Sequence, residues 1–170
     1  MIITTLFSNE ILMDTHFLRF DSQCYNSIMP ESKFNACAEE YRTYRPDYPA
    51  DLYDFLERKF RLQEGSNIVD VGAGTGKAAI VMAKRGWNVI GIELSKEMME
   101  QGKCAARDAG VEIDFRHGTT EDILAKTGSA DLVTSAQAFH WFDAPKALKE
   151  IHRVLKPKGG LAIWWNARDK

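Results

Sequence analysis

The stretch Ile68-Val69-Asp70-Val71-Gly72-Ala73-Gly74-Thr75-Gly76-Lys77 decides how the rest of the chain folds. It begins as an apolar run typical of a buried strand, turns on three glycines and continues into a helical pattern. Glycine has no Cβ, so such a turn can be tight and its backbone can approach a ligand closely. The helix that follows directs its N-terminal N–H groups and the positive end of its dipole at the turn. The stretch therefore predicts a nucleotide-type binding site.

The spacing of the glycines restricts the kind of nucleotide. Gly72, Gly74 and Gly76 are spaced G-x-G-x-G, and Lys77 stands where a dinucleotide fingerprint has its third glycine. The turn also lacks the G-x-x-x-x-G-K-[ST] pattern of a phosphate-binding P-loop. The spacing argues against both of these sites, but one short glycine motif does not by itself identify the ligand.

The composition fits a single globular domain and gives no sign of nucleic-acid binding. The chain has 170 residues, is 45% hydrophobic and carries a formal net charge of -2, without a polybasic segment. Its three cysteines, Cys24, Cys37 and Cys104, lack the spacing of a metal site or of a disulfide framework, which indicates a reducing compartment. No apolar run approaches the roughly 20 residues that span a bilayer, and the N-terminus is a poor signal peptide. We expect a cytoplasmic protein with no membrane or nucleic-acid partner.

Hydrophobic periodicity and turn residues predict alternating elements along the chain. The expected helices are 49–62, 77–85, 95–109, 120–126 and 143–155, and the expected strands are 67–71, 87–93, 111–115, 131–136 and 161–165. Strands that alternate with helices predict an α/β fold: a Rossmann-like parallel sheet with helices on both faces, in three α/β/α layers. Ligands of such sheets bind beyond the carboxyl ends of the strands, at the topological switch point.

Two acidic residues lie at this predicted edge of the sheet. Glu93 ends the second strand, 17 positions after Gly76, where a carboxylate can accept two hydrogen bonds from a ribose diol. The alternative for Glu93 is an acid that ends a strand and is simply solvated. Asp70 directly precedes the glycines, and as a buried acid it needs partners. We expect it to hold the turn or, through water, a bound amino group.

Several segments together resemble a known family. VDVGAGTGK (69–77), VIGIELS (89–95) and EIHRVLKPKGGLAIW (150–164) are similar to class I S-adenosylmethionine-dependent methyltransferases. The segments 34–49 and 137–142 are most similar to the type 11 group, near the trans-aconitate methyltransferase relatives. The resemblance covers about residues 34–169. It implies S-adenosyl-L-methionine as the cofactor and direct methyl transfer to a small-molecule acceptor.

The resemblance also implies a set of cofactor-binding residues at the glycine turn and at the ends of the strands. They are Gly72, Gly74 and Gly76 for the methionine part, Glu93 for the ribose hydroxyls, Leu94, Thr120 and Glu121 for the adenine, and Ala136 and Gln137 beside the methionine part. Many relatives have an aspartate where this chain has Thr119. Recognition of the adenine amino group is therefore left to backbone groups or to Glu121.

The resemblance places Tyr41 and Arg45 in an N-terminal lid over the cofactor, and the alternative is a plain proline-rich turn. Trp141 and Phe142 are expected to shape the acceptor pocket or to cover the crevice. Because the methyl donor is already activated, the protein mainly positions the reactants, and no metal is required. His140 is the candidate catalytic base, since histidine titrates near neutral pH. Its alternative is a structural histidine in an aromatic loop.

The chain ends at Lys170, shortly after the fifth expected strand, whereas relatives continue with strands six and seven. We therefore expect an N-terminal extension of unclear role (1–33) and a methyltransferase domain (34–170) that is truncated after strand five. That strand would be left at an open edge, where self-association through strand five is expected. Two other functions stay open: a truncated, non-catalytic cofactor-binding module and, against the glycine spacing, an NAD-dependent oxidoreductase.

Overall fold

The computed structural model of the chain describes residues 2–7 and 48–165. The helices in this part are α3 (Ala50–Phe60), α4 (Lys77–Lys84), α5 (Lys96–Asp108) and α6 (Ala144–Val154), with a short 3₁₀ turn, η2 (Phe139–Trp141). The strands are β1 (Ile2–Phe7), β2 (Asn67–Val71), β3 (Asn88–Glu93), β4 (Asp114–His117), β5 (Ala130–Ala136) and β6 (Leu155–Trp165).

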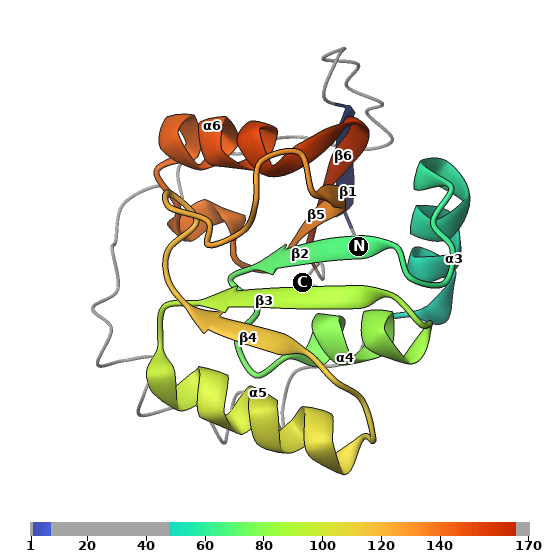
Figure 1. Ribbon diagram of the computed structural model, residues 1–170, viewed down its shortest axis with the longest axis vertical. Helices are drawn as coiled ribbons and strands as arrows, with labels where there is room; N and C mark the ends of the chain where they lie inside the picture. The colour runs from blue at the N-terminus through green and yellow to red at the C-terminus, as the bar shows by residue number, and fades with distance from the viewer. Residues whose placement is uncertain (1, 8–47, 166–170) are drawn as a thin grey trace, which may run out of the picture.

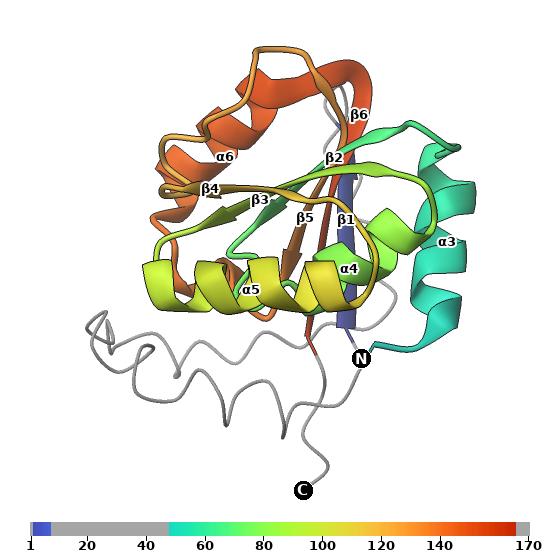
Figure 2. The ribbon, with the colours of Figure 1, turned by 60° about the horizontal axis from the view of Figure 1, so that its bottom comes forward.

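The strands form one six-stranded sheet in the order β1-β6-β5-β2-β3-β4 (Figure 1). Strands β2 to β6 all run parallel to one another, whereas β1 is antiparallel to β6. Figure 2 shows α3, α4 and α5 on one face of the sheet and α6 on the other. The predicted parallel α/β sheet with helices on both faces is confirmed.

Neighbouring residues of the central strand serve the two faces of the sheet. Ile68 of β2 packs in one core cluster with Leu52 of α3 and Met82 of α4, and Val69 packs in a second cluster with Ile151 of α6. This alternation follows from the two-residue period of a strand, and burial of each such side chain stabilises the fold by about 1.5–3 kcal/mol. The two clusters hold the central strand, and so the start of the glycine turn, from both sides.

The expectation of an open edge at the last strand is wrong. Residues 2–7 pair antiparallel with that strand over its full C-terminal half, from Ile2 opposite Trp165 to Phe7 opposite Gly160. The sequence signal for β1 was present, because Ile-Ile-Thr-Thr-Leu-Phe is rich in β-branched and aromatic residues. The predicted self-association depended on the β6 edge, and β1 occupies that edge.

The expected helix at 120–126 does not form. A helix over these residues would direct the N–H groups of Ile123 and Ala125 to the carbonyl oxygens four residues earlier. They donate instead to Oε2 of Glu150 (3.1 Å) and to the carbonyl oxygen of Ile123 (2.7 Å). Arg153 of α6 in turn donates to the carbonyl oxygens of Ile123 (2.7 Å) and Ala125 (3.0 Å). The segment between β4 and β5 instead runs as a loop over the α6 face of the sheet, anchored by the buried side chain of Ile123.

Two strands, β4 and β6, begin several residues away from the expected position. The strand predicted at 111–115 is β4, Asp114–His117, because the N–H of Val111 still bonds to Ala106 and closes the end of α5. The strand predicted at 161–165 begins at Leu155, since Lys156 binds both carboxylate oxygens of Asp131 at 2.8 Å and keeps this part of β6 beside β5.

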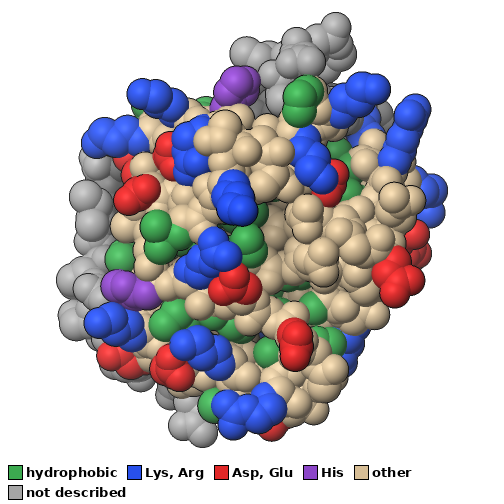
Figure 3. Space-filling model, viewed as in Figure 1, with side chains coloured by type: hydrophobic (Ala, Val, Ile, Leu, Met, Phe, Trp, Pro, Cys, Tyr) green, Lys and Arg blue, Asp and Glu red, His purple; other side chains and the backbone are tan. Residues whose placement is uncertain are grey.

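The described surface is mixed in charge and carries no membrane-spanning element. Figure 3 shows acidic and basic side chains interspersed on the face that it presents, without one extended basic region among the described residues there. None of the helices within residues 2–7 and 48–165 is both long and apolar enough to cross a membrane.

Proline at both Thr4 and Thr5 should destabilise the fold. Successive backbone N–H groups point to opposite sides of a strand, so one of these two N–H groups faces β6, and proline has none. We expect the free energy of unfolding of the T4P/T5P variant, measured in urea, to be lower by at least about 1–2 kcal/mol. The matched control is T4V/T5V, which keeps both N–H groups and the β-branched shape. Equal unfolding midpoints for the two double variants would show that β1 contributes nothing to stability.

Candidate active site

The glycine turn has the backbone conformation that only glycine adopts without strain. Gly72, Gly74 and Gly76 have φ angles of 70°, 58° and 77°, all in the left-handed region. The carbonyl oxygen of Ile92 on β3 accepts from the N–H groups of Gly72 (2.9 Å) and Ala73 (3.0 Å). The turn, which continues from β2, is therefore also fixed to the neighbouring strand β3.

Two of these glycines are also required by close contacts. A Cβ on Gly72 would lie 2.5 Å from the Cβ of Ala138, and one on Gly76 would lie 2.9 Å from Cζ of Phe115. The first contact is with the segment that follows β5, and the second is with β4. The turn therefore packs closely between the segment that follows β5 and a side chain of β4.

Glu93 joins the glycine turn to the start of α5. Its Oε2 accepts from the N–H of Gly74 (2.7 Å) and its Oε1 from the N–H of Ser95 (2.8 Å). Ser95 in turn caps α5, because its hydroxyl accepts from the N–H of Met98 (3.2 Å). Burial raises the pKa of Glu93, and the N–H donors of Ser95 and Gly74 oppose that rise. Each carboxylate oxygen still has a lone pair for a further donor.

Asp70 lies below the turn, on the central strand. Its Oδ1 accepts from the hydroxyl of Thr134 on β5 (2.7 Å), and its Oδ2 is buried without a partner. Burial raises the pKa of Asp70 to about 7, the Thr134 hydroxyl lowers it, and the charge of Glu93 raises it further. A buried acid with one unsatisfied oxygen can receive a proton, a water or a cationic group.

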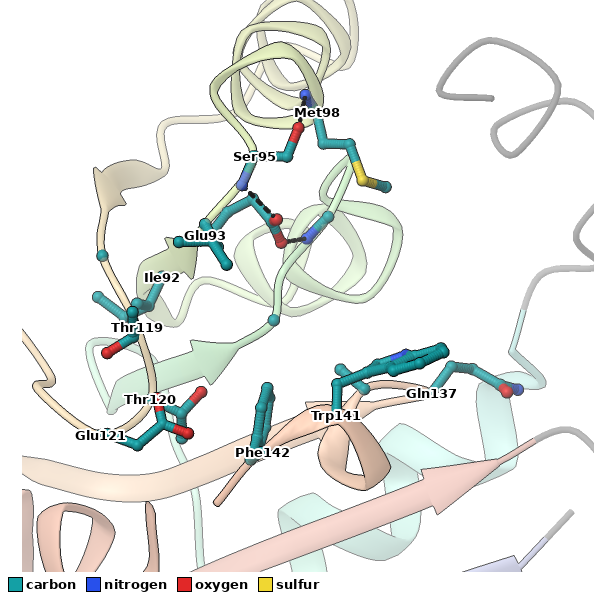
Figure 4. A pocket seen from close by; sticks show the side chains of 15 residues that line it. Ile92, Glu93, Ser95, Met98, Thr119, Thr120, Glu121, Gln137, Trp141 and Phe142 are labelled. Atoms are coloured by element: carbon teal, nitrogen blue, oxygen red, sulfur yellow. Dashed lines mark hydrogen bonds between the residues drawn. The ribbon is translucent and has the colours of Figure 1, made fainter. Parts of the chain in front are cut away.

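A cavity opens at the carboxyl ends of β2, β3, β4 and β5, and Figure 4 shows the side chains around it. Its lining includes nine residues that the sequence predicted for the site: Gly72, Gly74, Glu93, Leu94, Thr120, Glu121, Gln137, Trp141 and Phe142. Segments from four strands thus meet in one place, as the α/β topology predicts. No group of three or more His, Cys, Asp or Glu side chains in the described part of the chain could hold a metal ion.

Other predicted site residues lie elsewhere. Asp70, Gly76 and Ala136 support the cavity without lining it. His140 is exposed and also outside the lining, where its Nδ1 accepts from the indole N–H of Trp165 at 3.3 Å. Its ring packs against Trp141, with 4.6 Å between the centroids. Tyr41 and Arg45 lie outside the described residues, so the lid that they form in the resemblance stays a prediction.

The sequence did not single out every lining residue. Those missed as site residues are Ile92, Ser95, Met98, Gly118, Thr119 and Ala138. Most of them adjoin predicted residues, and their apolar or small side chains carry no chemical signal. Met98 is different, because it reaches the cavity from the first turn of α5, and its Cε would lie 3.3 Å from a Cβ on Gly74.

Gln137 adopts a backbone conformation that is unusual for a residue with a side chain. Its φ is 61°, and its N–H bonds to the carbonyl oxygen of Trp164 on β6 (3.0 Å). Backbone strain of this kind concentrates at functional sites and persists only where the surroundings enforce it. Gln137 starts the segment that carries Trp141 and Phe142 into the cavity wall.

Comparison with known proteins agrees with this geometry. The model of a family described as a methyltransferase domain matches residues 69–163. The chain belongs to this methyltransferase family. An uncharacterized methyltransferase of Schizosaccharomyces pombe is 38% identical over 137 residues, which cover 80% of this chain and 53% of that protein. A Saccharomyces cerevisiae protein named as an S-adenosylmethionine-dependent methyltransferase is 30% identical over 143 residues, 81% of this chain and 49% of that one.

Solved structures give the same fold. The YcgJ protein of Bacillus subtilis superimposes with a TM-score of 0.56 at 31% identity, over 61% of this chain and 45% of that one. A Methanococcus maripaludis protein, described as an S-adenosyl-L-methionine-dependent methyltransferase, superimposes with a TM-score of 0.70 at 24% identity, over 88% of this chain and 68% of that one. This chain spans about half the length of the curated relatives that it matches.

Alanine at Gly72 should destabilise this methyltransferase domain far more than alanine at Gly110. Both glycines have nearly the same φ, 70° and 69°, but a Cβ on Gly110 meets nothing within 4 Å. The left-handed conformation costs either variant about 1–2 kcal/mol, and the contact with Ala138 adds about 1–3 kcal/mol for G72A. Urea unfolding of both variants measures the difference. Equal losses would mean that the segment after β5 does not pack on the turn.

Asp70 should make stability fall as the pH rises. The fold raises its pKa from the ordinary 3.8 to about 7, so the unfolded chain releases this proton at a lower pH than the folded protein does. Asp70 therefore destabilises the fold progressively from about pH 4 to pH 7, by at most about 1.4 kcal/mol per pH unit, with no further change above pH 7. D70N, which cannot ionise, should gain stability relative to the unsubstituted protein across this range. A difference that does not vary with pH would contradict the buried neutral acid.

Proposed function

We propose that this chain binds S-adenosyl-L-methionine in the cavity and transfers its methyl group to a small-molecule acceptor. The observation that carries the proposal is the position of the cavity, where the sheet reverses its strand order between β2 and β5. Glu93 and the glycine turn meet there, as a bound nucleoside with an amino-acid tail requires. Family membership supports the reaction type.

The residues present suit a cationic nucleoside. The only charged side chains among the cavity-lining residues of the described chain are Glu93 and Glu121, both acidic. Gly72 and Gly74 present backbone instead of side chains, so a ligand can approach closely. The unpartnered Oδ2 of Asp70 lies beneath this turn and can hold an amino group through water.

The chain's own contribution is to bind and orient. Glu93 has free lone pairs for two ribose hydroxyls, and Leu94, which is 49% exposed, offers an apolar surface for the adenine. When bound, the cofactor supplies an electrophilic methyl group on a sulfonium. Trp141 and Phe142 would then hold the acceptor in line with that methyl group and exclude water.

The proposed reaction does not require proton transfer by His140. A base is needed only for an acceptor that is protonated at the working pH, and the imidazole lies outside the lining, bonded to Trp165. Its role as a base stays a prediction that depends on the acceptor. The scattered cysteines support the cytoplasm as the compartment.

Glu93→Ala should weaken binding of S-adenosylhomocysteine by about 1–3 kcal/mol, because the ribose hydroxyls lose a charged acceptor. Isothermal titration calorimetry measures the affinity. Glu112→Ala is the control, since Glu112 is exposed and does not line the cavity. An affinity unchanged in E93A would refute the ribose role, and binding of NAD without S-adenosylhomocysteine would favour an oxidoreductase.

Turnover separates an enzyme from a cofactor-binding module. Methyl transfer from S-adenosyl-L-methionine to a panel of amine, carboxylate, phenol and thiol metabolites would identify the acceptor class. Cofactor binding without turnover on any of them would favour the non-catalytic alternative, which the short span of the chain relative to its relatives keeps open.

A further inference from the structure

The cavity has two walls that come from different loops. One wall is the segment Gly118–Glu121, which follows β4, and the other is the segment 137–142, which follows β5 and leads into α6. Figure 4 shows Thr120 and Glu121 close to Phe142, where the two walls approach each other. The separation of these walls decides how wide the cavity is.

One hydrogen bond connects the walls at this point. Oε1 of Glu121 accepts from the backbone N–H of Asp143 at 2.9 Å. Asp143 follows Phe142 directly and caps α6, because its own carboxylate accepts from the N–H of Lys146 (3.4 Å). The Glu121 carboxylate therefore bonds the first wall to the residue at which the second wall becomes a helix.

The rest of the loop after β4 is held further along α6. Arg153 donates to the carbonyl oxygens of Ile123 and Ala125, while Oε2 of Glu150 accepts from the N–H of Ile123 at 3.1 Å. Glu150 and Arg153 also form an ion pair of 2.7 Å, and the Arg153 guanidinium lowers the pKa of the Glu150 carboxyl. This pair fixes the loop beyond Ile123. At the other end of the first wall the N–H of Gly118 bonds to the carbonyl oxygen of Glu93 at 3.1 Å. Between these two anchors, the bond of Glu121 to Asp143 connects the first wall to the second.

We propose that Glu121 is a positioning residue, which sets the separation of the cavity walls by accepting the N–H of Asp143. The inference rests on the proposed function, because its consequence is a cofactor affinity. It differs from the role that the resemblance implies, in which Glu121 contacts the adenine directly. The carboxylate acts on the ligand through the loop that carries Thr119 and Thr120.

Two substitutions at Asp143 isolate the bond. D143A loses the side-chain cap but keeps the N–H, whereas D143P loses both. Proline fits the site, since Asp143 has a φ of -69° and the preceding Phe142 is extended, with a ψ of 153°. We expect D143P to bind S-adenosylhomocysteine about tenfold more weakly than D143A in calorimetric titration, the effect of losing one hydrogen bond to a carboxylate. Equal affinities would overturn the proposal.

Substitution of Glu121 by glutamine tests whether Glu121 acts by positioning the loop or by contacting the ligand with its charge. E121Q keeps an oxygen that can accept from Asp143, so it should restore most of the affinity that E121A loses. The E121A/D143P double variant should bind no more weakly than E121A/D143A, because both lack the cap of Asp143 and E121A has already removed the bond that proline would break. If E121Q binds as weakly as E121A, the negative charge of Glu121 and not its hydrogen bond to Asp143 controls the affinity, and the proposal is wrong.

Hydrogen exchange tests the bond without any ligand. Amides in 118–122 should exchange faster in D143P and E121A than in D143A and E121Q, because the first wall loses its attachment. Equal exchange in all four variants would overturn the positioning role. Failure of the unsubstituted protein to bind S-adenosylhomocysteine would instead overturn the proposed function, and the exchange experiment would still decide the role of Glu121.

Discussion

The candidate site depends on the hydrogen bonds of the Glu93 carboxylate. Its two oxygens accept N–H groups from Gly74 and Ser95, so one side chain fixes the glycine turn, the end of β3 and the start of α5 together. Burial of a charge is unfavourable, and these donors offset only part of its cost, which is why the pKa of Glu93 is raised. A cationic ligand beside it would offset more. The buried carboxylate that holds the glycine turn thus also favours a ligand of positive charge.

The parts of the fold that depend on neighbouring residues were predictable from the sequence. The strand predicted at 67–71 has those bounds, because an apolar run ends there at glycines that need positive φ. Ser95 caps α5 as predicted, because its hydroxyl accepts from the N–H of Met98, three residues ahead. A local pattern also predicted that Glu93 ends a parallel strand at its carboxyl end. Nine of the predicted site residues line the cavity.

The parts that depend on distant partners were not predictable in this way. No local pattern shows that Ile2–Phe7 pairs with a strand 150 residues later, since only the β propensity of the segment is local. The segment 120–126 has a helical pattern, but the N–H of Ile123 bonds to Glu150, 27 residues later, and not to the carbonyl oxygen four residues earlier. The position of His140 outside the cavity lining was not predictable either, because it includes a hydrogen bond from Trp165, 25 residues later in the chain.

The glycine turn and the segment after β5 require each other. Gly72 can have no side chain because Ala138 lies where its Cβ would be, and Ala138 lies there because Gln137 turns the chain with a φ of 61°. A residue with a side chain in this conformation is strained by about 1–2 kcal/mol, so the packing around it must hold it. Its N–H bond to Trp164 on β6 supplies one such constraint. Because β1 pairs with that strand, the N-terminal residues are connected through β6 to the backbone that lines the cavity.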